Sequence, residues 1–146
     1  MQRARAGYQC SISNASGSIK ALEDRIRRNK EVIINIFMMH EAIAKCIKVS
    51  KKGDMNQHHG AIIIRQGCHL VTGHNYYEST RSNKSVHAEV DAIREFKKRY
   101  PKSWLRTSVM IVIRANKHED LLNSAPCAAC QKYIKKHGIP ATYFSS

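Results

Sequence analysis

The chain has 146 residues, 42% of them hydrophobic, and its 25 Lys and Arg residues outnumber its 11 Asp and Glu residues to give a formal net charge of +14. This length suits one domain with a buried core, and no apolar run approaches the roughly 20 residues of a membrane span. The charge indicates phosphorylated or polyanionic partners, and without a signal-peptide core or cysteine framework we expect a reducing, cytoplasmic location.

The first third of the chain predicts a polar leader and a long helix. Residues 1–17 carry little apolar patterning and are expected to be a disordered leader. The single domain is therefore placed at 18–146, with its core at about 31–146. From Glu31 to Ser50, apolar residues recur at helical spacing, with His40 on the same stripe, so this segment predicts an amphipathic helix.

Two short strands and a polar loop are expected next. Gly60–Arg65 and Cys68–Gly73 flank Gln66-Gly67, a pair of residues typical of a hairpin turn. The histidines before this hairpin, His58 and His59, are interpreted as surface or turn residues. The loop at 76–85 contains two tyrosines, of which Tyr76 could equally stack on a base or pack against the domain.

The remainder of the chain alternates between helix and strand. A helix over Val86–Tyr100 is ended by Pro101, and a buried strand is predicted at Ser108–Arg114. A second helix ends at Gly138, and Ala141–Phe144 forms the last strand. This order predicts an α/β domain in which helices cover a mixed sheet.

Two short motifs at predicted helix starts carry the chemistry. His87 and Glu89 open one helix, and Cys127 and Cys130 follow Pro126 at the start of the other. One imidazole and two thiolates favour Zn²⁺, and three protein ligands leave the fourth position to water, as in catalytic zinc sites. Zinc lowers the pKa of water from about 15.7 towards 7, and Glu89 suits proton transfer better than metal binding. The set predicts hydrolysis at an electrophilic carbon.

The two motifs, His87–Glu89 and Pro126–Cys130, match the His-x-Glu … Pro-Cys-x-x-Cys signature of zinc-dependent nucleobase deaminases. From about residue 37 to 143 the sequence resembles the cytidine/deoxycytidylate deaminase superfamily, in the branch of deoxycytidylate and tRNA adenosine deaminases. The resemblance implies a cytidine-deaminase-like three-layer αβα sandwich with a mixed sheet. A further helix and fifth strand, common in the family, are not predicted, and a second copy in a homo-oligomer could cover that edge.

The resemblance also assigns roles to residues by matching position. It implies that His87, Cys127 and Cys130 bind zinc and that Glu89 is the catalytic proton carrier. In the family, a Gly-Ala pair passes under the base, an Asn after the second strand contacts the sugar, and backbone groups beside the motifs contact the base. Together with Tyr76, the residues at these substrate-binding positions are Gly60, Ala61, Asn75, Ala88, Ser124 and Ala125.

Three functions remain open at this point. The first is deamination of cytosine to uracil on a (deoxy)cytidine nucleotide such as dCMP, favoured by the string from His87 to Ile93. The second is deamination of cytosine or adenosine in single-stranded DNA, RNA or tRNA, favoured by the basic excess. The third is a non-catalytic zinc module that binds nucleic acid, in which His137 supplies a fourth ligand. The first is preferred, because the third leaves Glu89 without a role.

Overall fold

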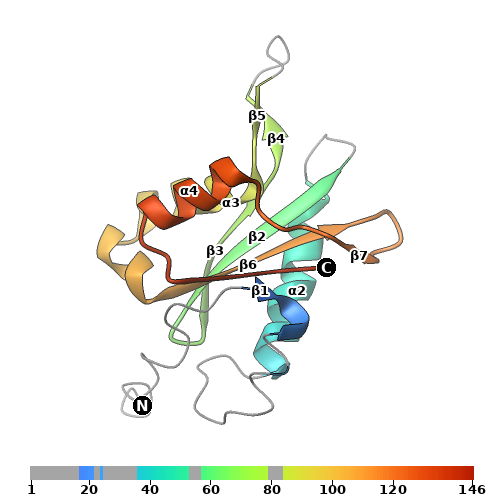
Figure 1. Ribbon diagram of the computed structural model, residues 1–146, viewed down its shortest axis with the longest axis horizontal. Helices are drawn as coiled ribbons and strands as arrows, with labels where there is room; N and C mark the ends of the chain where they lie inside the picture. The colour runs from blue at the N-terminus through green and yellow to red at the C-terminus, as the bar shows by residue number, and fades with distance from the viewer. Residues whose placement is uncertain (1–16, 22–23, 25–35, 53–56, 79–83) are drawn as a thin grey trace.

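The structure of the protein is a computed structural model that describes residues 17–21, 24, 36–52, 57–78 and 84–146. Apart from Gly17, the predicted leader lies outside these residues, as does the predicted helical segment 31–35. One face of the central sheet is covered by α3 (Ala88–Arg99) and α4 (Ala128–Lys136), and the other by α2 (Ile36–Ser50) (Figure 1). The predicted αβα sandwich is therefore confirmed. No helix in the described ranges has the length and apolar character needed to cross a membrane.

The sheet is mixed, as predicted. Its strands run in the order β1-β8-β6-β2-β3, and β7 pairs with β6. The pairs β6/β8 and β1/β8 are parallel, whereas β2 pairs antiparallel with both β3 and β6. The strands are β1 (Gly17–Ser18), β2 (His58–Arg65), β3 (Cys68–His74), β6 (Ser108–Ala115), β7 (Leu121–Leu122) and β8 (Ala141–Phe144).

Short elements connect these layers. A separate two-stranded ribbon pairs β4 (Tyr76–Tyr77) with β5 (Ser85–Val86), and a 3₁₀ helix, η2 (Lys102–Thr107), joins α3 to β6. The predicted hairpin turn is confirmed: Gln66 and Gly67 have φ values of 50° and 74° between β2 and β3. Two successive positive φ angles are typical of the type I′ turn, whose twist matches that of the flanking strands.

The N-terminal side of the chain contributes to the sheet edge next to β8. Gly17 and Ser18 pair in parallel with Tyr143 and Phe144, so β1 adds two residues beyond the fourth long strand. Pairing at this edge satisfies backbone groups that would otherwise be open to another chain. The predicted open edge is therefore partly covered from within the chain.

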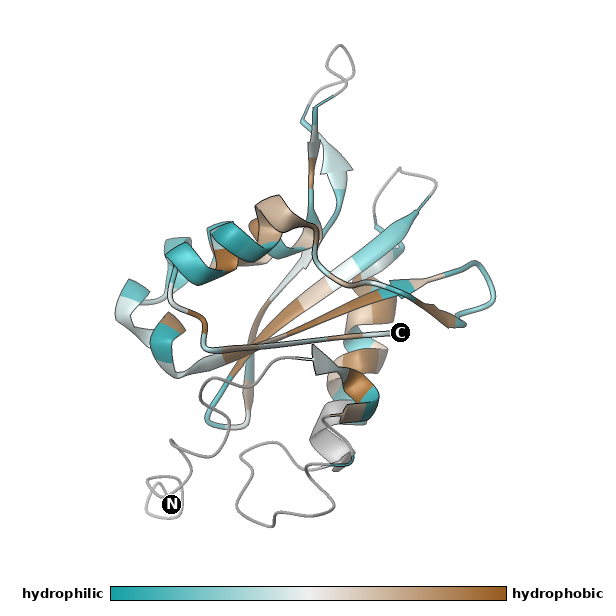
Figure 2. Ribbon diagram, in the orientation of Figure 1, coloured by the Kyte–Doolittle hydropathy of each residue, from teal (hydrophilic) through white to brown (hydrophobic). Residues whose placement is uncertain are grey.

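Two apolar cores lie on opposite faces of the sheet, and Figure 2 shows the apolar colouring concentrated along β2 and β6. Side chains alternate along a strand. Ile62 and Ile64 of β2 pack on the α2 side, whereas Ala61 and Ile63 pack on the side of α3 and α4. The residues of β6 divide in the same way, with Val112 on the side of α3 and α4.

The buried face of α2 differs from the predicted stripe. His40 and Ala44 are exposed, whereas Ala42 and Cys46 are fully buried. The reason is close contact with β2: a Cβ on Gly60 would lie 2.4 Å from the Cys46 carbonyl oxygen. The absence of a side chain at Gly60 lets the backbone of α2 rest on the strand at Cys46, and this contact sets the rotation of the helix.

Candidate active site

The three predicted metal ligands meet at the N-termini of α3 and α4. His87 is the N-cap residue of α3 and Cys127 is the N-cap residue of α4, whose Sγ accepts the Cys130 N–H at 3.4 Å. The Nδ1 atom of His87 lies 3.2 Å from Cys130 Sγ and 3.7 Å from Cys127 Sγ. All three donor atoms lie within 4.8 Å of one another.

This donor set fits a single tetrahedral zinc ion. With Zn–S distances of about 2.3 Å and Zn–N distances of about 2.0–2.1 Å, two ligand atoms on such an ion lie roughly 3.5–3.8 Å apart. His137, the fourth ligand of the structural alternative, is the C-cap residue at the other end of α4. Ten residues at 1.5 Å per residue place it roughly 15 Å along the helix from Cys127. The four-ligand arrangement with His137 is therefore wrong.

Glu89 is a buried carboxylate beside the ligands. Glu89 is only 4% exposed, and its side chain lies close to the Cys130 thiol. Burial raises the pKa of Glu89 above its ordinary value, against the opposing effects of its own backbone N–H, His87 and Cys130. A raised pKa makes the carboxylate a stronger base, which suits a group that takes a proton and later returns it.

The same burial acts on the ligand thiol. The pKa of Cys130 is raised, first by burial and then by the Glu89 carboxylate. Its thiolate form therefore needs a cation nearby, and a divalent ion held between His87, Cys127 and Cys130 supplies that charge.

Asn75 fixes the strand ends next to this site. Its side chain is buried, and its Oδ1 atom accepts the His59 N–H at 2.9 Å while its Nδ2 atom donates to the Gln57 carbonyl at 2.6 Å. Two residues earlier, a Cβ on Gly73 would lie 2.5 Å from the Ala88 carbonyl oxygen, so β3 touches the first turn of α3. Asn75 therefore lies beside the helix terminus that follows His87.

The other candidate substrate residues occupy varied positions. Gly60 turns toward α2, whereas Ala61 is buried on the face of the sheet that carries the metal ligands. Tyr76 is half-buried, with its ring 5.6 Å from that of His74. Ala88 is the first residue of α3, where a backbone N–H lacks an acceptor within the helix.

Ser124 ties the segment before Cys127 to the sheet. Its hydroxyl donates to the Val112 carbonyl at 2.9 Å and lies 2.8 Å from Ser145 Oγ, and its N–H donates to the Ser145 carbonyl at 2.8 Å. The next N–H, that of Ala125, donates to Asn123 Oδ1 at 2.9 Å. These hydrogen bonds of Ser124 fix the position of the segment before Cys127 relative to β6.

The prediction that His58 and His59 are surface or turn residues is wrong, because both lie in β2 and are half-buried. His59 belongs to β2, is half-buried, and by strand alternation shares the face of Ala61. Its cross-strand partner on β6 is Arg114, which lies on the same face of the sheet as Val112. The alternation of Ala61 and Ile63 would have placed His59 on this face, had the strand been extended two residues upstream.

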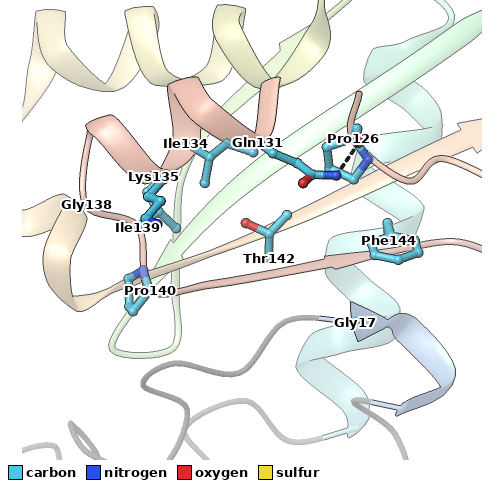
Figure 3. A pocket seen from close by; sticks show the side chains of 10 residues that line it. All are labelled: Gly17, Pro126, Gln131, Ile134, Lys135, Gly138, Ile139, Pro140, Thr142 and Phe144. Carbon is cyan, nitrogen blue, oxygen red and sulfur yellow. Dashed lines mark hydrogen bonds between the residues drawn. The ribbon is translucent and has the colours of Figure 1, made fainter. Parts of the chain in front are cut away.

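Two of the hollows beside α4 differ in their relation to the metal ligands. One, of about 720 Å³, lies between α4 and β8, where Gln131 Nε2 donates to the Pro126 carbonyl at 2.9 Å (Figure 3). No metal ligand lines it. The three ligands instead line a groove of about 270 Å³ between β5, α3 and α4. The groove therefore borders the metal ligands, whereas the larger hollow is separate from them.

Comparison with known sequences decides the family. The family model described as the cytidine and deoxycytidylate deaminase zinc-binding region matches residues 36–146. The chain belongs to the cytidine and deoxycytidylate deaminase family. This membership confirms the predicted zinc cofactor and makes the chain a zinc-dependent deaminase. A search of the curated proteins gives no match.

Solved structures share the fold. The dCMP deaminase of the cyanophage S-TIM5 in its apo form is 19% identical, with a TM-score of 0.62 over 76% of this chain and 84% of that chain. The same phage enzyme in complex with dCMP and dUMP is 18% identical, with a TM-score of 0.60 over 76% and 82%. The cytidine deaminase of Mycobacterium tuberculosis is 14% identical, with a TM-score of 0.53 over 73% and 83%. At these identities, the comparison confirms the cytidine-deaminase-like architecture.

Proposed function

We propose that this deaminase converts the cytosine base of a (deoxy)cytidine nucleotide, such as dCMP, into uracil and ammonia. The observation that carries the proposal is the buried carboxylate of Glu89 beside three residues that could hold a zinc ion. A solved structure with the same fold was obtained in complex with dCMP and dUMP, which supports this choice of substrate.

Glu89 moves the protons of the reaction. Zinc held by His87, Cys127 and Cys130 lowers the pKa of water and so supplies a nucleophile at neutral pH. The Glu89 carboxylate takes one proton from the water whose oxygen bonds to C4 of cytosine, and gives it to N3. It then carries the second proton of that water to the amino nitrogen, so that the C4–N4 bond breaks and ammonia leaves.

The residues around Glu89 orient the nucleotide. The Ala88 N–H, at the start of α3, donates to the carbonyl of the base. The backbone carbonyls of Ser124 and Ala125 lie toward the departing amino group, and the Asn75 amide contacts the sugar. The hydrogen bonds of Asn75 to β2 and of Ser124 to β6 hold these groups in place before substrate arrives, which reduces the ordering cost of binding.

The mononucleotide is preferred over a polynucleotide because of where cations gather on the two helices of the site. The last turns of α3 and α4 carry Lys97, Lys98, Arg99, Lys135 and Lys136. The metal ligands lie at the opposite ends of these helices. Two of the cations, Lys98 and Arg99, also pair with Glu95 at 2.7 and 3.5 Å. These cations therefore favour general attraction of anions over guiding a strand into the site.

A substrate panel tests the proposal. Zinc-loaded protein would be incubated with cytidine, deoxycytidine, CMP, dCMP, guanine, adenosine and single-stranded oligonucleotides, with ammonia and base products measured. We expect dCMP to yield dUMP and ammonia in equal amounts. Glu89→Gln should keep its zinc but lose about 10²- to 10⁴-fold in rate. No ammonia from any cytosine substrate, or full activity in Glu89→Gln, would overturn the proposal.

A further inference from the structure

Arg114 is a half-buried arginine on the sheet face that carries the metal ligands. Among the described residues, no acidic side chain pairs with its guanidinium. Arg94 and Arg99, by contrast, pair with Glu78 and Glu95 at 3.8 and 3.5 Å. A partly desolvated guanidinium without a carboxylate is suited to an anionic ligand, because its planar fork matches a phosphate.

The neighbours of Arg114 fix its position relative to the site. On one side its cross-strand partner is His59, whose N–H is held by Asn75. On the other side its own N–H donates to Ser145 Oγ at 3.2 Å, and that hydroxyl lies 2.8 Å from Ser124 Oγ. Arg114 therefore lies between the Asn75 strand end and the segment that leads to Cys127.

Asn75, His59 and Arg114 lie side by side across neighbouring chain segments. They follow one another in that order from the end of β3 to β6, which is joined through Ser145 to the segment before Cys127. Adjacent strands are about 4.8 Å apart, so Asn75 and Arg114 are roughly 10 Å apart. If the base lies at the metal and the sugar at Asn75, a 5′-phosphate on that sugar comes within reach of the long Arg114 side chain.

We propose that Arg114, with His59 beside it, binds the 5′-phosphate of the nucleotide substrate. This inference rests on the proposed function, because it takes the base to lie at the zinc site. The His59 ring offers a hydrogen bond next to the guanidinium. Burial and the charge of Arg114 lower the pKa of His59 to about 4, so the ring is neutral at pH 7 and does not repel the guanidinium. The site therefore takes nucleoside monophosphates in preference to nucleosides.

Calorimetric binding of dUMP and deoxyuridine to the zinc-loaded protein tests this without relying on turnover. We expect dUMP to bind roughly ten- to a hundredfold more tightly than deoxyuridine, as charge-assisted hydrogen bonds to a phosphate provide. Arg114→Gln should abolish that difference, and Arg114→Lys should keep part of it. The matched control is Arg106→Gln, an exposed arginine on η2 at the other end of β6, which should leave the difference intact. Zinc content and thermal unfolding show whether each variant folds.

Three results would overturn the inference. The first is an unchanged preference for dUMP in folded, zinc-loaded Arg114→Gln. The second is equal binding of dUMP and deoxyuridine by the wild type while it still deaminates deoxycytidine, which would leave the proposed function standing. The third is an Arg114→Gln variant that binds dUMP as the wild type does but binds a single-stranded oligo-dC probe more weakly. That result would make Arg114 a contact for polynucleotides. Failure of the proposed function is seen separately, as absence of deamination in the substrate panel.

Discussion

The Oδ2 atom of Asp91 accepts the backbone N–H of His74 at 3.0 Å, and this hydrogen bond joins the first turn of α3 to the end of β3. Asp91 is buried, and its own N–H donates to the carbonyl of the metal ligand His87 at 3.0 Å. One residue therefore holds the strand end before Asn75 in register with the helix start that carries His87. The metal and the candidate sugar contact are positioned by the same link.

Replacing Asp91 should destabilise the fold most when the new side chain has no oxygen to accept the His74 N–H. Asp91→Ala leaves the His74 N–H without its partner and should lower the free energy of unfolding by about 1–3 kcal/mol. Asp91→Asn keeps an acceptor oxygen and should lose less than half as much. Urea unfolding of both variants measures the difference. Equal free energies of unfolding for Asp91→Ala and wild type would show that this hydrogen bond does not stabilise the fold.

Gly73 and Gly60 offer a matched pair of backbone contacts on opposite faces of the sheet. A Cβ at Gly73 would lie 2.4 Å from Ala92 N on α3, and one at Gly60 would lie 2.4 Å from Cys46 O on α2. Each Gly→Ala change should destabilise the fold by about 1–3 kcal/mol or more, because a helix backbone must move.

Only the Gly73→Ala change should also reduce zinc affinity, since α3 follows the ligand His87, whereas α2 carries no ligand. Competition with a chelator measures this. Equal zinc affinity in the two variants would mean that the contact of β3 with α3 does not position His87.

His59 should make stability depend on pH. Its pKa is about 4 in the folded protein, lowered by burial and then by the charges of Arg114 and His87, against about 6.5 in the unfolded chain. The unfolded chain therefore binds the extra proton first on acidification. The stabilising contribution of neutral His59 is complete above about pH 6.5 and is lost as the pH falls towards 4.

The size of this effect follows from the shift and the exposure of the ring. With a discount for its exposed part, the loss should be roughly 1–2 kcal/mol. The measurement is the free energy of unfolding from pH 8 to 4 for wild type and His59→Gln at equal zinc loading. Acidification should destabilise the wild type more steeply than the variant. If the free energies of unfolding of wild type and His59→Gln fell in parallel with pH, the pH dependence could not be assigned to His59.

The parts of this protein that could be predicted from sequence depend on short-range spacing. Cys127 and Cys130 share one helical turn, and the Gln66-Gly67 turn needs two residues that accept positive φ. Both features are local, and both are confirmed. The order of strands and helices likewise gave the layered architecture.

What could not be predicted depends on contacts between distant segments. The face of α2 that is buried is decided at Gly60, and several apolar residues around that helix made other rotations equally plausible. β2 begins two residues earlier than its apolar run, because β6 extends to Ala115 and pairs with His58. This extension is what brings His59 and Arg114 into the site, and neither residue has an apolar signal of its own.

X-ray absorption at the zinc edge tests the central claim most directly. In the zinc-loaded protein we expect two sulfur ligands at about 2.3 Å, one imidazole nitrogen and one further light atom at about 2.0–2.1 Å with no second imidazole signal. Cys127→Ser should remove one sulfur, whereas Cys68→Ser should leave the spectrum unchanged. A shell of four protein ligands, with two imidazoles or with three or more sulfurs, would contradict an open catalytic position beside Glu89.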